Sequence, residues 1–219
     1  MKLNIEYSID KDLWNYTRFF GDTGYSYGEV NKSESIVNRL PQKIQDVFHS
    51  GDTNEQKSRR ILEYLRLNYK EKESEMGGNI KKINDTWKSV GNQVIYQLET
   101  FYNKKFPFDE VTAFITTNII CPYNFEKRYF FLHKSPVQIQ LSTAKHELNH
   151  FMFLHYYPQL EKDLGNNNYQ LLKESLTFFT NPEQSGYTDE KKLRELYMSK
   201  KWVGPDEILR SAVELLTNS

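Results

Sequence analysis

The stretch VTAFITTNII, residues 111–120, decides the fold class, because it is dense in β-branched residues and predicts a strand in an otherwise helical chain. Two further strands are predicted after it, RYFFL at 128–132 and VQIQL at 137–141, joined by the turn-like sequence HKSP. A short strand is also predicted at 3–8. A small sheet between two groups of helices indicates the α+β class.

Apolar residues at helical spacing predict helices on both sides of these strands. Pro41 should kink or split one of them, and the glycines of EKESEMGGN, residues 71–79, should end another. We divide the chain into a mainly helical N-terminal region, 1–105, and a second region, 106–219, packed together as one compact unit. The predicted helices span 11–20, 33–48, 53–70, 80–103, 143–157, 168–180, 188–200 and 205–217.

The composition restricts the function. The 219 residues carry 29 basic and 29 acidic side chains, so the net charge is zero and a polyanion-binding protein is not expected. No run of 18 apolar residues is present, and the N-terminal sequence lacks the apolar core of a secretory signal. With a single cysteine, Cys121, no intrachain disulfide can form. We therefore expect a cytoplasmic, soluble protein with neither a nucleic-acid nor a membrane partner.

The strongest chemical signal is HELNH, residues 146–150. On a helix, His146 and His150 lie one turn apart on the same face, a separation that one metal ion can bridge. Glu147 lies beside them, where it can take a proton from a water molecule on that metal and pass it to a leaving group. This is the chemistry of the HExxH motif of zinc-dependent hydrolases.

A third ligand is needed, and Glu174 is the best candidate. Glu161, Asp163 and Glu183 fall in predicted loops, whereas Glu174 lies within the apolar helical stretch LLKESLTFF. A carboxylate there is costly unless it is paired or bound to a metal. A helix that returns antiparallel would bring it to the histidines. The alternative is a surface glutamate paired with Lys173.

HELNH followed by Glu174 in ESLT resembles the gluzincins, zincin metallopeptidases whose zinc is held by two histidines and a glutamate, and the compact chain is similar to their small "minigluzincin" members. The resemblance covers about residues 108–181. It implies that His146, His150 and Glu174 bind one Zn²⁺ and that Glu147 is the general base and acid in peptide hydrolysis. It also implies a zincin-like fold, with a small twisted mixed sheet over the HExxH helix and a helical C-terminal subdomain. The strand at 128–132 would be the edge strand that pairs with the substrate.

Several assignments stay open at this point. Tyr169 and Tyr187 are candidates for stabilising an oxyanion, and Asn149 either bonds to a neighbouring element or faces solvent. Cys121 and His155 are more typical of structural residues than of metal ligands. The leading hypothesis is a zinc peptidase acting on a peptide or protein. The alternatives are a metal-binding regulatory or interaction protein without general peptidase activity, and a protease dedicated to a single protein partner.

Overall fold

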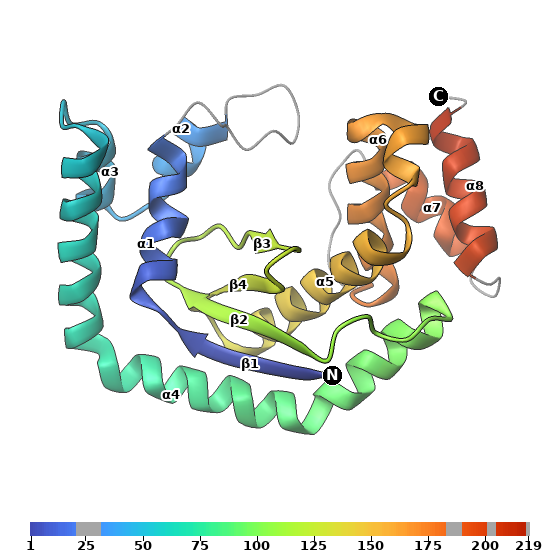
Figure 1. Ribbon diagram of the computed structural model, residues 1–219, viewed down its shortest axis with the longest axis horizontal. Coiled ribbons are helices and arrows are strands. Elements are labelled where there is room, and N and C mark those ends of the chain that lie inside the picture. The colour runs from blue at the N-terminus through green and yellow to red at the C-terminus, as the bar shows by residue number, and fades with distance from the viewer. Residues whose placement is uncertain (21–31, 183–189, 201–204, 218–219) are drawn as a thin grey trace. The chain divides into compact units, whose positions relative to one another are not determined.

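The computed structural model describes residues 1–20, 32–182, 190–200 and 205–217, and these form a mixed α+β structure dominated by helices (Figure 1). The α+β class predicted from the sequence is therefore confirmed. The candidate residues Glu183 and Tyr187 lie outside the described residues. In chain order the elements are β1 (Lys2–Tyr7), α1 (Ile9–Thr17), η1 (Arg18–Phe20), α2 (Lys32–Val37), α3 (Gln42–Phe48), α4 (Asn54–Tyr102), β2 (Glu110–Thr116), β3 (Tyr123–Asn124), β4 (Tyr129–His133), α5 (Val137–Tyr156), α6 (Leu160–Ser175), η2 (Leu176–Phe179), α7 (Lys191–Ser199) and α8 (Pro205–Thr217).

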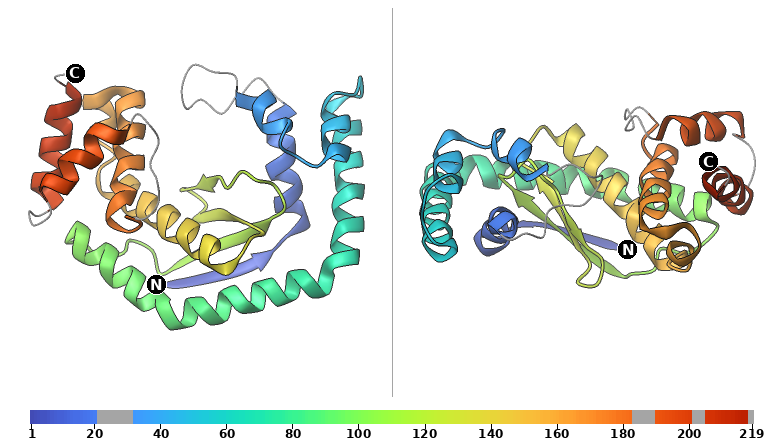
Figure 2. Two further views of the ribbon diagram at one scale, coloured as in Figure 1. Left: turned by 180° about the vertical axis from the view of Figure 1, so that it is seen from behind. Right: turned by 90° about the horizontal axis from the view of Figure 1, so that it is seen from above.

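The chain divides into two compact units. The sheet unit comprises Lys2–Thr86 and Glu110–Gln140, and the helical unit comprises Met1, Trp87–Asp109 and Leu141–Ser219. Each unit thus draws on both sides of the strand-rich stretch, and the boundary expected at 105/106 stays a prediction. In the helical unit, α6 packs against α7 and α8, which lie side by side in Figure 2.

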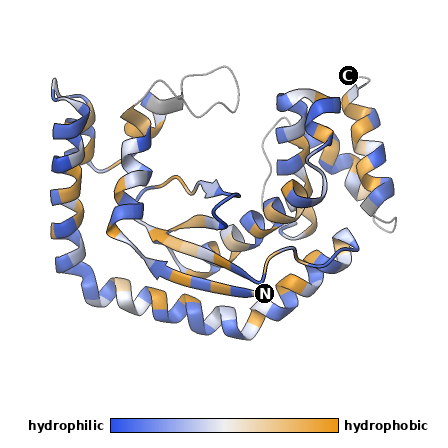
Figure 3. Cartoon of the chain, viewed as in Figure 1, coloured by the Kyte–Doolittle hydropathy of each residue, from blue (hydrophilic) through white to orange (hydrophobic). Residues whose placement is uncertain are grey.

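The sheet has the strand order β1-β2-β4-β3. The first three strands are parallel, with Tyr7 opposite Ile115 and Thr116 opposite His133, while β3 is antiparallel to β4. The prediction that 128–132 forms an edge strand is therefore wrong, because β4 lies between β2 and β3. Tyr129 to Leu132 are all buried, as is typical of an internal strand covered on both faces. β1 alternates between apolar and polar residues instead, as Figure 3 shows.

The prediction that the glycines within residues 71–79 end a helix is wrong. The glycines at 77 and 78 do not end a helix, because α4 continues through them and departs from helical geometry only at Lys72 (φ −119°, ψ 19°). Glycine lowers helix propensity but does not impose a turn. Met76 and Ile83 on either side are buried, so packing holds the helix together.

The stretch 137–141 is the first turn and a half of α5 rather than a strand. Pro136 precedes the helix, and its carbonyl accepts hydrogen bonds from the backbone N–H groups of Ile139 and Gln140. Proline is well suited to a helix start because its φ is already fixed near the helical value. A five-residue apolar and polar alternation could not distinguish the two structures. The helix start predicted at residue 143 consequently lies inside α5.

Two clusters of buried apolar residues contribute to the core of the sheet unit. A smaller cluster of Phe114, Tyr129 and Phe131 lies on the sheet, with Cys121 packed against it. The larger cluster joins α1, α3 and the start of α4, and Pro41 separates α2 from α3 as expected. Its buried members are Tyr16, Leu40, Ile44, Val47, Ile61 and Leu65. In the part of the chain that the structure describes, no helix has the length and apolar character needed to cross a membrane.

Candidate metal centre

Helix α5 positions the two histidines of HELNH. Ala144, Leu148 and Met152 have no exposed surface, so this face of the helix is fixed in the core of the helical unit. His146 and His150 are one turn apart, with ring centroids separated by 4.3 Å and ring planes at 77°. The helical spacing predicted from the sequence therefore places the two imidazoles next to each other.

Glu174, close to the end of α6, meets both histidines. Its Oε2 atom lies 3.1 Å from Nε2 of His146 and 3.4 Å from Nε2 of His150. One possible ligand atom from each residue lies within 4.8 Å of the other two. Zinc with tetrahedral bonds of about 2.0–2.1 Å holds its ligand atoms about 3.3–3.4 Å apart. The measured separations therefore suit a single small metal ion between the three side chains.

The other acids and the extra histidine considered from the sequence do not join this group. Glu161 and Asp163 are exposed, and they lie in the first part of α6 rather than in a loop. The helix is interrupted after them at Gly165, whose φ of +70° is accessible to glycine but strained for other residues. His155 is exposed and contacts the ring of Phe108 edge-on.

Lys173 contacts the other oxygen of the same carboxylate. Its side chain is only 4% exposed, and Nζ lies 3.1 Å from Oε1 of Glu174. The lysine pairing considered from the sequence thus exists together with the histidine contacts. The two oxygens of Glu174 thus have different partners: Oε1 contacts the ammonium group of Lys173, and Oε2 contacts the two imidazoles.

These contacts set the ionisation of the cluster. Burial would raise the pKa of Glu174, but His150, His146 and Lys173 together hold it far below its ordinary value. Burial lowers the pKa of His150 to about 3, and the nearby lysine adds to this effect. An ionised carboxylate and a neutral imidazole are the forms that bind metals.

Glu147 is buried beside the cluster, with 6% of its surface exposed. Burial, together with the charge of Glu174, raises its pKa to about 7 against the opposing charges of His146 and Lys173. Within the described residues, its Oε2 atom and Nδ1 of His146 are buried and have no hydrogen-bond partner. A carboxylate with a free buried oxygen next to two imidazoles and a second carboxylate fits a site that takes up an ion and water.

Asn149, the fourth residue of HELNH, is the supporting residue that the sequence could not assign. Its Oδ1 atom accepts a 2.7 Å hydrogen bond from the hydroxyl of Tyr102. Its Nδ2 atom donates to the carbonyl of Leu176 and to Oγ1 of Thr180, both at 3.2 Å. All of these groups are buried, so Asn149 ties α5 to the end of α4 and to the turn that follows Glu174. A polar residue on an otherwise apolar helix face was the only sequence signal for this role.

The remaining residues considered from the sequence have structural surroundings. Tyr169 is 2% exposed and packs on the ring of Phe153, itself fully buried, with centroids 5.0 Å apart. Sγ of Cys121 accepts a hydrogen bond from the backbone N–H of His133 at 3.0 Å. Cys121 does not belong to the group of possible ligands found among the described residues.

Comparison of the chain with models of known protein families, with curated proteins and with solved structures gave no match.

Proposed function

We propose that this protein is a zinc-dependent peptidase of gluzincin type. The observation that carries the proposal is the convergence of His146, His150 and Glu174, with Oε2 of the glutamate 3.1 and 3.4 Å from the two imidazole nitrogens. Two imidazole nitrogens and one carboxylate are a usual ligand set for catalytic zinc. The order of the residues, HELNH and then a glutamate on the next helix, is that of the gluzincins.

The chemistry divides between the ion and the chain. His146, His150 and Glu174 would hold the ion, which when bound supplies Lewis acidity to a peptide carbonyl and lowers the pKa of water. Glu147 takes the proton from the attacking water and returns it to the departing amine. Its pKa of about 7 suits both steps, because a group that titrates near the working pH can accept and donate a proton.

Lys173 and Asn149 position these groups. Lys173 engages Oε1 of Glu174 and so leaves Oε2 directed to the histidines. Asn149 connects the helix of the two histidines to the backbone just beyond Glu174. Such supporting contacts fix ligand orientation, and their loss commonly weakens metal binding by about 10–100-fold.

The test combines metal content with peptide cleavage. The purified chain should hold about one zinc per molecule, and Glu174→Ala should lose it. Glu147→Gln should keep the zinc and abolish cleavage of a peptide library. Glu161→Gln, at an exposed acid on the same helix as Glu174, is the matched control and should retain both properties.

The outcomes separate the proposals. A wild-type chain that takes up no zinc refutes the metal centre, and a Glu147→Gln variant that cleaves peptides as fast as the wild type refutes the assigned role of Glu147. Zinc binding without cleavage of any peptide or protein favours a regulatory metal-binding protein. Cleavage of one protein but no library peptide favours a dedicated protease.

A further inference from the structure

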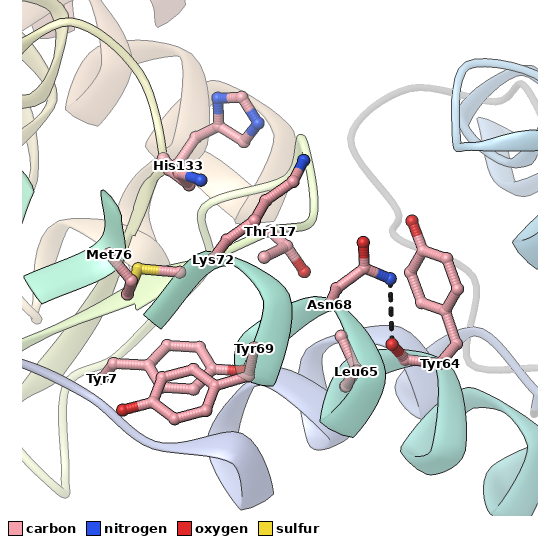
Figure 4. Close-up of a pocket in the computed structure, with 10 residues that line it drawn as sticks. Tyr7, Tyr64, Leu65, Asn68, Tyr69, Lys72, Met76, Thr117 and His133 are labelled. Carbon is pink, nitrogen blue, oxygen red and sulfur yellow. Dashed lines mark hydrogen bonds between the residues drawn. The ribbon is translucent and has the colours of Figure 1, made fainter. Parts of the chain in front are cut away.

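A second, independent site lies in the sheet unit, at the carboxyl ends of the three parallel strands. Tyr7 ends β1, Thr117 directly follows β2, and His133 ends β4, and all three side chains line one pocket (Figure 4). In open sheets with parallel strands, ligands bind in the crevice outside the carboxyl ends of the strands. The position of the pocket is thus one where this kind of sheet commonly receives a small molecule.

The other wall of the pocket is one face of α4. Tyr64, Asn68 and Lys72 are spaced by four residues and therefore project from the same side of the helix. Lys72 is also the residue at which α4 departs from helical geometry. Interruptions of a long helix have identifiable causes and often mark functional positions. Here the interruption lies in the pocket wall.

The pocket has flat apolar surfaces suited to a ring. The rings of Tyr7 and Tyr69 lie one over the other (Figure 4). Their centroids are 4.9 Å apart, and the angle between their planes is 7°. Tyr64 and Met76 add further apolar surface. The cavity volume is about 160 Å³. An engineered cavity of roughly 150 Å³ is known to hold benzene, so one ring-sized group fits.

The basic side chains of the pocket lining favour an anionic ligand. Lys72 and Lys134 line the pocket together with His133, and no carboxylate is among its described lining residues. Lys134 is already paired with Glu75 at 3.0 Å. Lys72 forms no ion pair within the described parts of the chain, although its charge helps to lower the pKa of Glu75, so its ammonium group can still meet an incoming anion.

The buried acid Asp12 contacts two residues of the lining without being part of it. Asp12 has no exposed surface. Its oxygens accept hydrogen bonds from the hydroxyl of Tyr7, from the hydroxyl of Thr116 and from the backbone and side chain of Thr117. These bonds fix the strand ends that form the pocket floor.

We propose that this pocket binds a small organic anion, in which a planar ring lies against the tyrosines and a phosphate or carboxylate group meets Lys72. The ring supplies the contact area and the ammonium group supplies a charge-assisted hydrogen bond. The side-chain amide of Asn68, which donates to the carbonyl of Tyr64, has a second N–H group to offer the anionic group. The proposal does not depend on the metal centre or on peptidase activity.

Phenyl phosphate is the probe, with inorganic phosphate and phenol as its two halves and benzoate as the carboxylate counterpart. Binding to the whole chain is measured by titration calorimetry, and the site is located by NMR shifts of the Asn68, Thr117 and Lys134 amides. Phenyl phosphate or benzoate should bind more tightly than phosphate or phenol. Lys72→Gln should weaken that binding roughly tenfold or more, as expected for loss of a hydrogen bond to a charged group.

Lys81→Gln is the matched control, since Lys81 is an exposed lysine of the same helix that pairs with Asp85 outside the pocket. It should bind the probe within about twofold of the wild type. Tyr69→Leu should weaken binding of phenyl phosphate while leaving that of inorganic phosphate unchanged. Glu147→Gln should bind like the wild type, which separates this test from that of the peptidase.

Three results would overturn the proposal. The first is the absence of saturable binding by either aromatic anion. The second is equal affinity in the Lys72→Gln and Lys81→Gln variants, which would place the anion elsewhere. The third is phenol binding as tightly as phenyl phosphate, which would make the pocket an apolar ring site without anion selectivity.

Discussion

Tyr102→Phe should destabilise the protein by about 2 kcal/mol, because it removes a hydrogen bond between two groups that water cannot reach. Tyr102 is 1% exposed and Asn149 is fully buried, and the tyrosine hydroxyl lies 2.7 Å from Oδ1 of Asn149. A hydrogen bond contributes about 0.5–1.5 kcal/mol net, and an unpaired buried acceptor costs about 1–3 kcal/mol. The phenyl ring keeps the ring contact with Phe101, so packing should change little.

Urea unfolding and thermal melting measure the effect. For a chain of this length, a loss of about 2 kcal/mol corresponds to a melting temperature roughly 4–8 °C lower. Tyr156→Phe is the matched control, because the hydroxyl of Tyr156 also donates a hydrogen bond, to the carbonyl of Lys105, but at a solvent-exposed position. Water replaces that bond, so the change should stay within about 0.5 kcal/mol. Equal effects in the two variants would refute the reasoning.

The same variant also reports on the proposed metal centre. Once the hydroxyl of Tyr102 is lost, Asn149 is held only by its bonds to Leu176 and Thr180, beside the turn that follows Glu174. We expect zinc affinity to fall by about tenfold, the lower end of the usual effect of supporting residues. Unchanged zinc affinity together with reduced stability would show that Asn149 supports the fold and not the ligands.

Three further changes test other parts of the structure. Gly91→Ala should lower the melting temperature, since the new Cβ would lie 2.7 Å from the indole of Trp87. Gly78→Ala in the same helix meets open space and should stabilise the protein by about 0.5–1 kcal/mol. Thermal melting should therefore show shifts of opposite sign for the two variants. Burial raises the pKa of Asp12, so its contribution to stability is fully present below the unfolded-state pKa and is lost as pH rises through the folded-state pKa. Urea unfolding should therefore show the wild type gaining stability over Asp12→Asn as pH falls from neutral towards 4, and a difference independent of pH would contradict the shift. In metal-free protein at neutral pH, Glu147→Gln should raise the melting temperature, because it replaces a buried, incompletely paired carboxylate by a neutral group; a lower melting temperature would count against that view.

Much of the fold could be predicted because its elements have long periodic patterns or clear boundary residues. The strand at residues 3–8 and the helix after Pro205 are found close to their predicted positions. The failures occur where local signals are weak or ambiguous. The five alternating residues 137–141, which precede the HELNH motif, fit a strand or a helix equally well. The helix-weakening effect of the two glycines within α4 was outweighed by packing of the residues around them.

The candidate site was predictable to the extent that its chemistry is local. The spacing of His146 and His150 follows from helix geometry alone. Glu174 was identifiable because a carboxylate in an apolar helix needs a partner. The contacts of Asn149 with Tyr102 and with the turn after Glu174 depend on how α4 and η2 pack on α5, which the sequence does not encode in any local pattern. The position of β4 within the sheet is a tertiary property of the same kind.

The surroundings of Glu147 best distinguish a functional site from a purely structural network of ion pairs. His146, His150, Lys173 and Glu174 could by themselves form a buried network in which each charge has a partner. A second carboxylate adds to such a network a charge interaction with His146, but it leaves a buried oxygen without a partner in the described structure. Residues that reduce stability in this way are typical of sites selected for activity. The unsatisfied oxygen of Glu147 is thus the feature that a purely structural explanation leaves unaccounted for, and a water molecule at the proposed metal centre would account for it.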